Sequence, residues 1–307
     1  MKLGREPIAN GTELRIRGAS SVQRVALMGL GVMGSGMAGQ LLEHGFALTV
    51  YNRTPARAAA LKPRGAQVAS SAADAAGNAD VVLSMVADDK ASREVWLGEM
   101  GALSAARPGT VIVECSTLSP GWVRELGRAA GEHKCEFLDA PVTGSKSHAA
   151  SGELAFLVGG DAATLERARP VLQAMSRKVI HVGASGSGAL LKLINNYLCG
   201  VQAASLAEAI ALIERSGLNR DSALEILNNG APGSPLMKAL SARMTARIYE
   251  VNFALELMQK DLQYAGQEAA EHSVEFRTGK AAEQLFREAR QRGWEGKDFS
   301  SVAEALR

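Results

Sequence analysis

Apolar runs separated by helical stretches dominate the first 190 residues of the chain. The run Val25-Ala26-Leu27-Met28 leads through a glycine-rich turn into a helical pattern that ends near His44, and a second apolar run covers residues 46–51. Further strand-like runs occupy residues 66–69, 80–86, 110–114, 136–141, 154–158 and 178–182. Near-continuous apolar strands separated by helices predict a parallel sheet covered on both faces.

The strand signals stop after residues 183–188, and the remainder has helical periodicity. Its longest helix is expected from Ala189 to Ile213, because the apolar positions there recur with a helical period. The pattern therefore predicts an α/β chain, with a doubly wound parallel sheet domain followed by an all-α C-terminal domain. We place the sheet domain at residues 23–186 and the helical domain at residues 187–307, and interpret residues 1–22 as a loose N-terminal extension.

The segment Gly29-Leu30-Gly31-Val32-Met33-Gly34 is the most informative motif. Between a strand and a helix, Gly29 allows a tight turn, Gly31 lets the backbone approach a pyrophosphate, and Gly34 lets the helix pack near the strand. A purely structural glycine turn is the alternative in a chain with 32 glycines. The flanking strands favour a dinucleotide site.

The residues after the second strand bear on the choice of dinucleotide. NAD sites usually place Asp or Glu there, whereas this chain has Asn52, followed by Arg53 and Thr54. An amide, a guanidinium that can hold phosphate in bidentate fashion and a hydroxyl favour NADP. The alternative is that Arg53 is only a solvated loop residue. We therefore predict NADP as the cofactor.

Composition narrows the remaining classes. A length of 307 residues predicts about two domains, and 47% hydrophobic with 21% charged residues is ordinary for a soluble globular enzyme. The net charge of +2, from 34 basic and 32 acidic residues without long like-charge runs, gives no reason to expect nucleic acid as a partner. No segment approaches the roughly 20 uninterrupted apolar residues of a membrane span, so no membrane is expected either.

Cysteine and histidine usage and the N-terminal residues point to a cytoplasmic protein. Three cysteines without CxxC or metal-type spacing fit reduced thiols, and five histidines without a ligand pair predict no metal site. The first 20 or so residues have neither the apolar stretch of an export signal nor the Ser/Arg-rich pattern of a transit peptide.

Four further segments complete a set of five ordered motifs. They are Glu114-Cys115-Ser116-Thr117, residues 139–146, residues 192–196 and Lys260-Asp261-Leu262. With the glycine motif, they resemble the β-hydroxyacid dehydrogenase family over nearly the whole chain, from about Arg24 to Leu306. The resemblance implies a Rossmann-type N-terminal domain, an all-helical C-terminal domain and an active site in the cleft between them. It also favours a homodimer or homotetramer.

Within this family, the chain looks most similar to the glyoxylate/succinic semialdehyde reductases. The matching stretches are residues 141–146, Gly230-Ala231 with Pro235, and residues 298–302. Ser147-His148-Ala149-Ala150 departs from that branch, which commonly has Pro-Ala-Glu-Asp there, while residues 158–161 and Asn195-Asn196 look more like the hydroxyisobutyrate or tartronate group. Chemistry on 3-hydroxyisobutyrate or tartronate semialdehyde is therefore the first alternative.

Lys192 and Asn196 are the expected catalytic residues. Hydride transfer to a carbonyl builds negative charge on its oxygen, so a proton donor must lie within hydrogen-bond reach. Lys192 lies four residues before Asn196 on one helical face, so the amide can orient the ammonium or the substrate. The ordinary lysine pKa of about 10.4 suits reduction at neutral pH, whereas oxidation would need a lower one. A lysine reaching into solvent is the alternative.

Several assignments around these two residues follow from position or resemblance. Ser116-Thr117 follows a strand end, where its hydroxyls could hold a substrate carboxylate or the nicotinamide side, or only stabilise a turn. The family implies that Gly144 and Ser145 offer backbone N–H groups to the carboxylate. It also implies that Lys260 approaches the cofactor and helps close the cleft, a solvated charge pair being the alternative.

Two loop residues near this pocket remain. Lys146 either adds positive charge to the pocket or is a surface lysine. His148 lies close to the pocket loop. We interpret it as incidental, because Lys192 already fills the role of the acid.

We predict an NADPH-dependent reductase that converts small aldehyde acids, such as glyoxylate or succinic semialdehyde, reversibly into hydroxy acids, with Lys192 as general acid and base. Substrate binding is expected at Ser116, Thr117, Gly144, Ser145, Lys192 and Asn196. Cofactor binding is expected at Gly29, Leu30, Gly31, Val32, Met33, Gly34, Asn52, Arg53, Thr54, Met85, Val86, Thr117 and Lys260. An imine reductase fits less well, because that group commonly replaces the lysine. A catalytically silent scaffold is disfavoured by the retained Lys192.

Overall fold

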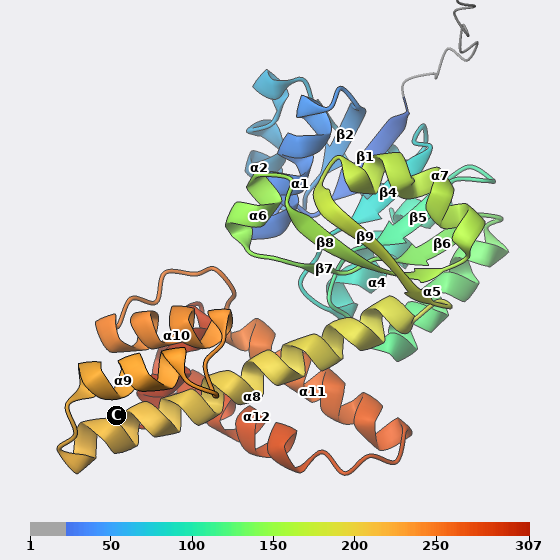
Figure 1. The fold of residues 1–307 in the computed structure, drawn as a ribbon. Coiled ribbons are helices and arrows are strands. Elements are labelled where there is room, and N and C mark those ends of the chain that lie inside the picture. Colours follow the sequence, from blue (N-terminus) through green and yellow to red (C-terminus); the bar gives the residue numbers. More distant parts are fainter. Residues whose placement is uncertain (1–22) are drawn as a thin grey trace, which may run out of the picture.

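The computed structural model describes residues 23–307, so the interpreted N-terminal extension lies outside the described residues. Figure 1 shows two parts, a sheet flanked by helices and a group of helices, which are joined by the long helix α8 (Ser187–Ser216). This arrangement confirms a Rossmann-type sheet domain followed by a helical C-terminal region.

The sheet domain contains a nine-stranded sheet in the order β3-β2-β1-β4-β5-β6-β8-β7, with β9 paired to β8. The strands are β1 (Arg24–Met28), β2 (Ala47–Tyr51), β3 (Gln67–Val68), β4 (Val81–Ser84), β5 (Val111–Glu114), β6 (Glu136–Asp139), β7 (Val142–Thr143), β8 (Leu154–Gly160) and β9 (Ser176–Gly183). Its helices are α1 (Val32–Glu43), α2 (Pro55–Ala59), α3 (Ala72–Ala76), α4 (Asp89–Leu97), α5 (Pro120–Glu132), α6 (Lys146–Ala150) and α7 (Ala162–Gln173), with short 3-10 turns at Lys62–Arg64 and Ala102–Ser104.

Strand direction reverses at one side of this sheet. Strands β1 to β6 pair in parallel, but β8 is antiparallel to both β6 and β7, and β9 is parallel to β8. The predicted parallel sheet is therefore confirmed for β1 to β6, and the pairings of β8 with β6 and β7 depart from it. The ten residues 144–153, which include α6, separate β7 from β8, and a parallel crossover needs a dozen or more residues, so the chain turns back.

Alternating side chains of β1 show how the sheet is covered on both faces. Val25 and Leu27 belong to an apolar cluster that includes α1 and α7, whereas Ala26 and Met28 belong to a cluster that includes α5. Successive residues of a strand point to opposite faces, so each face of β1 is buried under helices. The apolar runs in the sequence are nearly continuous because both faces of such a strand are buried.

The helical domain packs around α8. Its other helices are α9 (Arg220–Asn229), α10 (Pro235–Ala246), α11 (Leu255–Glu271) and α12 (Arg277–Ala289), followed by short turns at Arg290–Trp294 and Phe299–Ala305. A third apolar cluster joins α8 to α10, α11 and α12. Since α8 also begins at the sheet, its side chains contact the sheet domain at its start and the helical domain further along.

In the described part of the chain, α8 is the one helix that is long and apolar enough to cross a membrane. Half of its most apolar 18-residue window is buried inside the protein. Core helices pass the same test of length and composition, so these two properties alone do not identify a span.

Candidate active site

The glycine motif forms a tight turn that leaves one face open. Gly29 has a φ of +92°, and a Cβ atom there would lie 2.2 Å from the carbonyl oxygen of Met85. A Cβ atom on Gly34 would lie 2.0 Å from the carbonyl oxygen of Gly29, whereas one on Gly31 would meet nothing within 4 Å. Packing thus requires the outer two glycines. The open position at Gly31 fits the close approach of a pyrophosphate.

The N-terminus of α1 also fits a phosphate. Gly31 is the N-cap residue, no side chain caps the helix, and the first turn contains no acidic residue. By contrast, the side chains of Asp88 and Ser119 cap α4 and α5. Uncapped N–H groups at a helix start, together with the positive end of the helix dipole, favour a bound anion.

Asn52 joins the glycine turn to the loop that follows β2. Its Oδ1 atom accepts a 2.8 Å hydrogen bond from the Leu30 N–H, and its Nδ2 atom donates to the Thr54 carbonyl at 3.0 Å. Both polar atoms of the Asn52 amide therefore have hydrogen-bond partners within the protein. Arg53 and Thr54 are exposed beside it.

The loops after β4 and β5 are tied together by Ser116. The Val86 N–H donates to the Ser116 Oγ atom at 2.8 Å, and only 1% of Ser116 is exposed. The structure thus shows the turn-stabilising role for this hydroxyl, whose own hydrogen can still donate. The Met85 N–H is bonded to the Met28 carbonyl within the sheet, so Val86 is the first residue of its loop held by a side chain.

Lys192 lies on α8 close to its attachment to the sheet. Asp139, at the end of β6, accepts hydrogen bonds from the N–H groups of Gly186 at 2.7 Å and Ala189 at 2.9 Å. These bonds attach the first turn of α8 to the sheet domain, so they position Lys192 one turn further along. The lysine is half-buried, with its helix neighbours Leu191 and Ile194 exposed.

Burial lowers the pKa of Lys192 below its ordinary value. The Asp261 carboxylate acts in the opposite direction and raises this pKa, and the Lys260 ammonium lowers it. The expectation of an ordinary lysine pKa is therefore wrong, because desolvation disfavours the charged form. A lowered pKa makes the neutral amine, and hence proton acceptance, more accessible.

Asn196 binds Asp261 rather than standing free. It is 4% exposed, and its Nδ2 atom donates to the Asp261 Oδ2 atom at 2.6 Å, while its Oδ1 atom accepts from Asn195 at 2.9 Å. Asn196 therefore holds the carboxylate whose charge raises the pKa of Lys192. The sequence reasoning assigned no role to Asp261, although its place in the Lys260-Asp261 pair was a signal.

Lys260 connects the two domains. Its Nζ atom donates to the Thr117 carbonyl at 2.5 Å, lies 3.0 Å from the Asp261 Oδ1 atom and sits 4.9 Å from the ring centre of Tyr264. The side chains of Lys260 and Asp261 are 15% and 1% exposed, which excludes a solvated charge pair. The Asp261 Oδ1 contact is an ion pair without hydrogen-bond geometry.

His148 organises the loop predicted to bind the substrate carboxylate. The Ser145 N–H donates to the His148 Nδ1 atom at 3.1 Å, and the Ser145 Oγ atom lies 2.7 Å from the same nitrogen. This is a capping box at the start of α6, with histidine in place of the usual Glu or Gln. The interpretation of His148 as incidental is wrong, and the Ser-x-x-His spacing was the missed signal. Gly144 has a φ of +125°, and Lys146 is exposed.

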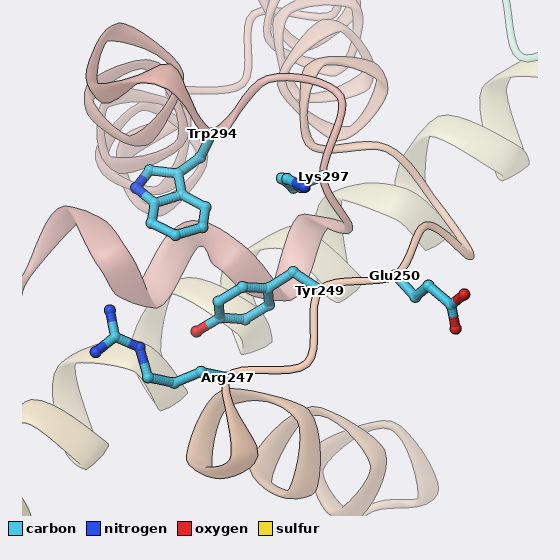
Figure 2. A pocket seen from close by; sticks show the side chains of 5 residues that line it. All are labelled: Arg247, Tyr249, Glu250, Trp294 and Lys297. Carbon is cyan, nitrogen blue, oxygen red and sulfur yellow. The ribbon is translucent and has the colours of Figure 1, made fainter.

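A cavity of about 290 Å³ lies elsewhere, in the helical domain (Figure 2). The residues that line it are Arg247, Tyr249, Glu250, Trp294 and Lys297. The rings of Tyr249 and Trp294 meet edge to face with 5.5 Å between their centres. None of the predicted site residues lines this cavity. The buried charges around Lys192 therefore identify the candidate site better than cavity shape does.

Comparisons with known proteins agree with this geometry. The sequence model of the NAD binding domain of 6-phosphogluconate dehydrogenase matches residues 24–183, and that of the NAD-binding region of NADP-dependent 3-hydroxyisobutyrate dehydrogenase matches residues 186–306. The chain therefore belongs to the β-hydroxyacid dehydrogenase family and is an NAD(P)-dependent oxidoreductase.

Relatives in this family have different substrates in their names. The chain is 38% identical to an NAD-dependent L-serine dehydrogenase of Pseudomonas aeruginosa, over 92% of this chain and 97% of the relative. It is 33% identical to the chloroplastic glyoxylate/succinic semialdehyde reductase 2 of Arabidopsis thaliana, over 92% and 79%. A structure of Mycobacterium tuberculosis 3-hydroxyisobutyrate dehydrogenase with L-serine matches with a TM-score of 0.85 and 32% identity, over 94% and 100%. NAD(P)-dependent hydroxyacid dehydrogenase activity is common to these names.

Proposed function

We propose that this enzyme uses NADPH to reduce small aldehyde acids, such as glyoxylate or succinic semialdehyde, and catalyses the reverse oxidation. The observation that carries the proposal is the position of Lys192, a half-buried lysine on α8 just beyond the attachment of this helix to the sheet, where the Asp261 carboxylate favours its ammonium form. The name of the plant relative supports the substrate class.

The residues that would hold the dinucleotide lie at the ends of β1, β2, β4 and β5. The open turn at Gly31 and the uncapped start of α1 suit the pyrophosphate. Exposed Arg53 and Thr54, with no acidic residue at that position, suit the 2′-phosphate of NADPH. When bound, the dinucleotide supplies the hydride that adds to the carbonyl carbon.

Lys192 donates the proton during reduction and accepts it during oxidation. During reduction, its ammonium donates a proton to the carbonyl oxygen, which completes the hydroxyl and leaves a neutral amine that solvent reprotonates. During oxidation, the neutral amine accepts the proton of the hydroxyl. The Asp261 carboxylate, held by Asn196 at 2.6 Å, raises the pKa of Lys192 and so favours its ammonium form.

We assign the substrate carboxylate to Gly144 and Ser145. The Ser145 N–H is engaged by His148 in the present structure, so a carboxylate either shares this donor or binds through the Ser145 hydroxyl. The competition between imidazole and carboxylate makes this loop the part of the site where the identity of the acid is selected.

A homodimer or homotetramer remains our expectation for the assembly, and a cytoplasmic location remains a prediction. Leu191, Ile194 and Leu198 are 38%, 45% and 52% exposed, and they lie on one side of α8. A second copy that covers these side chains would bury them. Light scattering after gel filtration tests this expectation.

Oxidation of a 3-hydroxy acid such as L-serine is the second candidate function. The lowered pKa of Lys192 favours a proton acceptor, and the serine dehydrogenase is 38% identical. Initial rates distinguish the candidates: NADPH and NADH are each tested with glyoxylate, succinic semialdehyde, methylmalonate semialdehyde and tartronate semialdehyde, and NADP⁺ and NAD⁺ with L-serine and 3-hydroxyisobutyrate. The proposal requires the highest kcat/KM with NADPH and glyoxylate or succinic semialdehyde. A higher value for L-serine with NAD⁺ would replace it.

A further inference from the structure

A buried carboxylate lies directly beneath the loops that we assign to cofactor and substrate. Glu114 is the last residue of β5 and is 1% exposed. No basic side chain in residues 23–307 forms an ion pair with it. Burying a charge in this way is costly unless hydrogen bonds compensate, so the donors around Glu114 explain how it is tolerated.

The two oxygens of Glu114 serve different partners. Its Oε2 atom accepts hydrogen bonds from Ser84 Oγ at 2.6 Å, Ser92 Oγ at 2.7 Å and Trp96 Nε1 at 2.8 Å. Its Oε1 atom accepts a single hydrogen bond, from the Ser116 N–H at 2.9 Å. Oε2 thus faces the core side of β4 and α4, and Oε1 faces the loop.

The single bond to Oε1 reaches the proposed site through a short chain. Ser116, held by Glu114, accepts the hydrogen bond from the Val86 N–H at 2.8 Å. The carbonyl of the next residue, Thr117, accepts a hydrogen bond from the Lys260 ammonium. A shift of the Ser116 backbone would therefore move the Met85-Val86 loop, the Ser116-Thr117 loop and the contact between Thr117 and Lys260.

We propose that Glu114 is a positioning residue for the reaction, which fixes the Ser116-Thr117 and Met85-Val86 loops in the geometry that the dinucleotide and substrate need. The inference rests on the proposed function for its kinetic consequence. Its structural content, an anchor acting through Oε1, can be tested by dinucleotide binding alone.

Replacing Glu114 by glutamine distinguishes the roles of the two carboxylate oxygens, because one of them becomes an NH₂ group. An amide has one acceptor oxygen and one NH₂ group that only donates. The Ser84 hydroxyl can rotate, and the Ser92 oxygen also accepts a hydrogen bond from Trp122 Nε1 at 2.9 Å, but the N–H groups of Trp96 and Ser116 are fixed donors. The amide oxygen therefore faces the three donors on the core side, and the NH₂ group is left against the Ser116 N–H. The substitution Glu114→Gln should release the loop while leaving the fold intact.

Trp96→Phe is the matched control, because it removes a donor from the same carboxylate at its other oxygen. Trp96 touches neither loop through a hydrogen bond. We expect Glu114→Gln to lower kcat about 10- to 100-fold, as for a small misplacement of reacting groups, and to weaken NADPH binding. Trp96→Phe should lower the midpoint of thermal unfolding but leave kcat and NADPH binding within about twofold of wild type.

The double variant Glu114→Gln with Trp96→Phe should restore activity. Without the fixed indole N–H, the NH₂ group can donate to the rotatable hydroxyl of Ser84, and the amide oxygen can again accept from Ser116. We expect its kcat to exceed that of Glu114→Gln by about fivefold or more, although it carries one more core substitution. A merely structural role would make the double variant equal to or worse than the single one.

The kinetic and binding measurements test the proposed substrate and the positioning role of Glu114 separately. If wild type reduces none of the aldehydes, the proposed substrate fails, while fluorescence titration with NADPH still tests Glu114. Equal NADPH affinities for Glu114→Gln and Trp96→Phe, or no recovery in the double variant, would overturn the positioning role. Should Glu114→Gln not fold, hydrogen exchange on wild type decides: protected amides at Ser116 and Val86 without NADPH support the anchor, and unprotected amides refute it.

Discussion

The Lys260 ammonium lies 2.5 Å from the Thr117 carbonyl oxygen and so bonds the helical domain to the end of β5. The same side of α11 makes further contacts one turn apart. Tyr264 accepts from the Asp89 N–H at 3.4 Å, and Arg124 of α5 lies between two acidic residues of α11 further along. One stripe of α11 therefore determines how the helical domain meets the sheet domain.

Removing the charge in Lys260→Met should raise the Kd for NADPH about tenfold or more, because a charge-assisted hydrogen bond with 15% exposure is lost beside the proposed nicotinamide position. Arg277→Gln is the control. Arg277 and its partner Glu275 are 79% and 67% exposed, and surface ion pairs contribute about 0–1 kcal/mol, so the Kd of this variant should change little. Titration of NADPH fluorescence measures both. Equal effects of the two substitutions would argue against a special role for Lys260.

The sequence predicts those parts of the fold and site that depend on local pattern. The glycine turn, the strand runs and the helical face shared by Lys192 and Asn196 follow from spacing over a few residues. The reversal at β8 and the roles of Glu114 and Asp261 do not, because they depend on partners far along the chain, such as Ser84 for Glu114 and Asn196 for Asp261. His148 shows the opposite case, since its capping spacing is local but uses an unusual residue.

Lys192→Ala should lower kcat for aldehyde reduction about a hundredfold or more, as expected for loss of a general acid, while the Kd for NADPH changes little. Lys192→Arg should fail similarly, because a guanidinium keeps its proton at working pH. Asn196→Ala should cost less, since it acts through Asp261. The exposed Lys178→Ala, on β9 and outside the proposed site, serves as the control in steady-state kinetics. Near-normal turnover of Lys192→Ala would transfer the proton step to another group.

The pH dependence follows from the direction of the Lys192 shift. Burial lowers the pKa of Lys192 below 10.5, so the neutral amine forms at lower pH than for an ordinary lysine. The rate of hydroxy acid oxidation should rise with pH and level off at a lower pH than an ordinary lysine would give, while the rate of reduction should fall over the same range.

Neighbouring charges should move this midpoint in opposite directions. Asp261→Asn removes the charge that raises the pKa of Lys192, so the midpoint should shift to lower pH. Lys260→Met removes a charge that lowers it, so the midpoint should shift to higher pH. Profiles of kcat against pH measure both. Shifts in the same direction would show that the profile reports another group.

Arg53→Ala should weaken NADPH binding by about 1.5 to 3 kcal/mol, the range for a charge-assisted hydrogen bond, and leave NADH binding nearly unchanged. The exposed Lys62→Ala, from the turn after α2, is the control for a general loss of positive charge. Titrations with both dinucleotides provide the comparison. A wild type that binds NADH more tightly than NADPH would reject the cofactor assignment.

His148 offers a test of where the substrate carboxylate binds. Gln at position 148 is a normal capping-box residue, so His148→Gln should keep the Gly144-Ser145 loop and change kcat/KM for glyoxylate by no more than about threefold. His148→Glu also preserves the capping box but adds a negative charge next to Ser145. Repulsion between this carboxylate and that of the substrate should raise the KM for glyoxylate about tenfold or more. An uncharged aldehyde of similar size, such as acetaldehyde, should show no such rise, because it has no carboxylate to repel. A KM increase that is equal for the two aldehydes, or absent for both, would place the substrate carboxylate away from this loop.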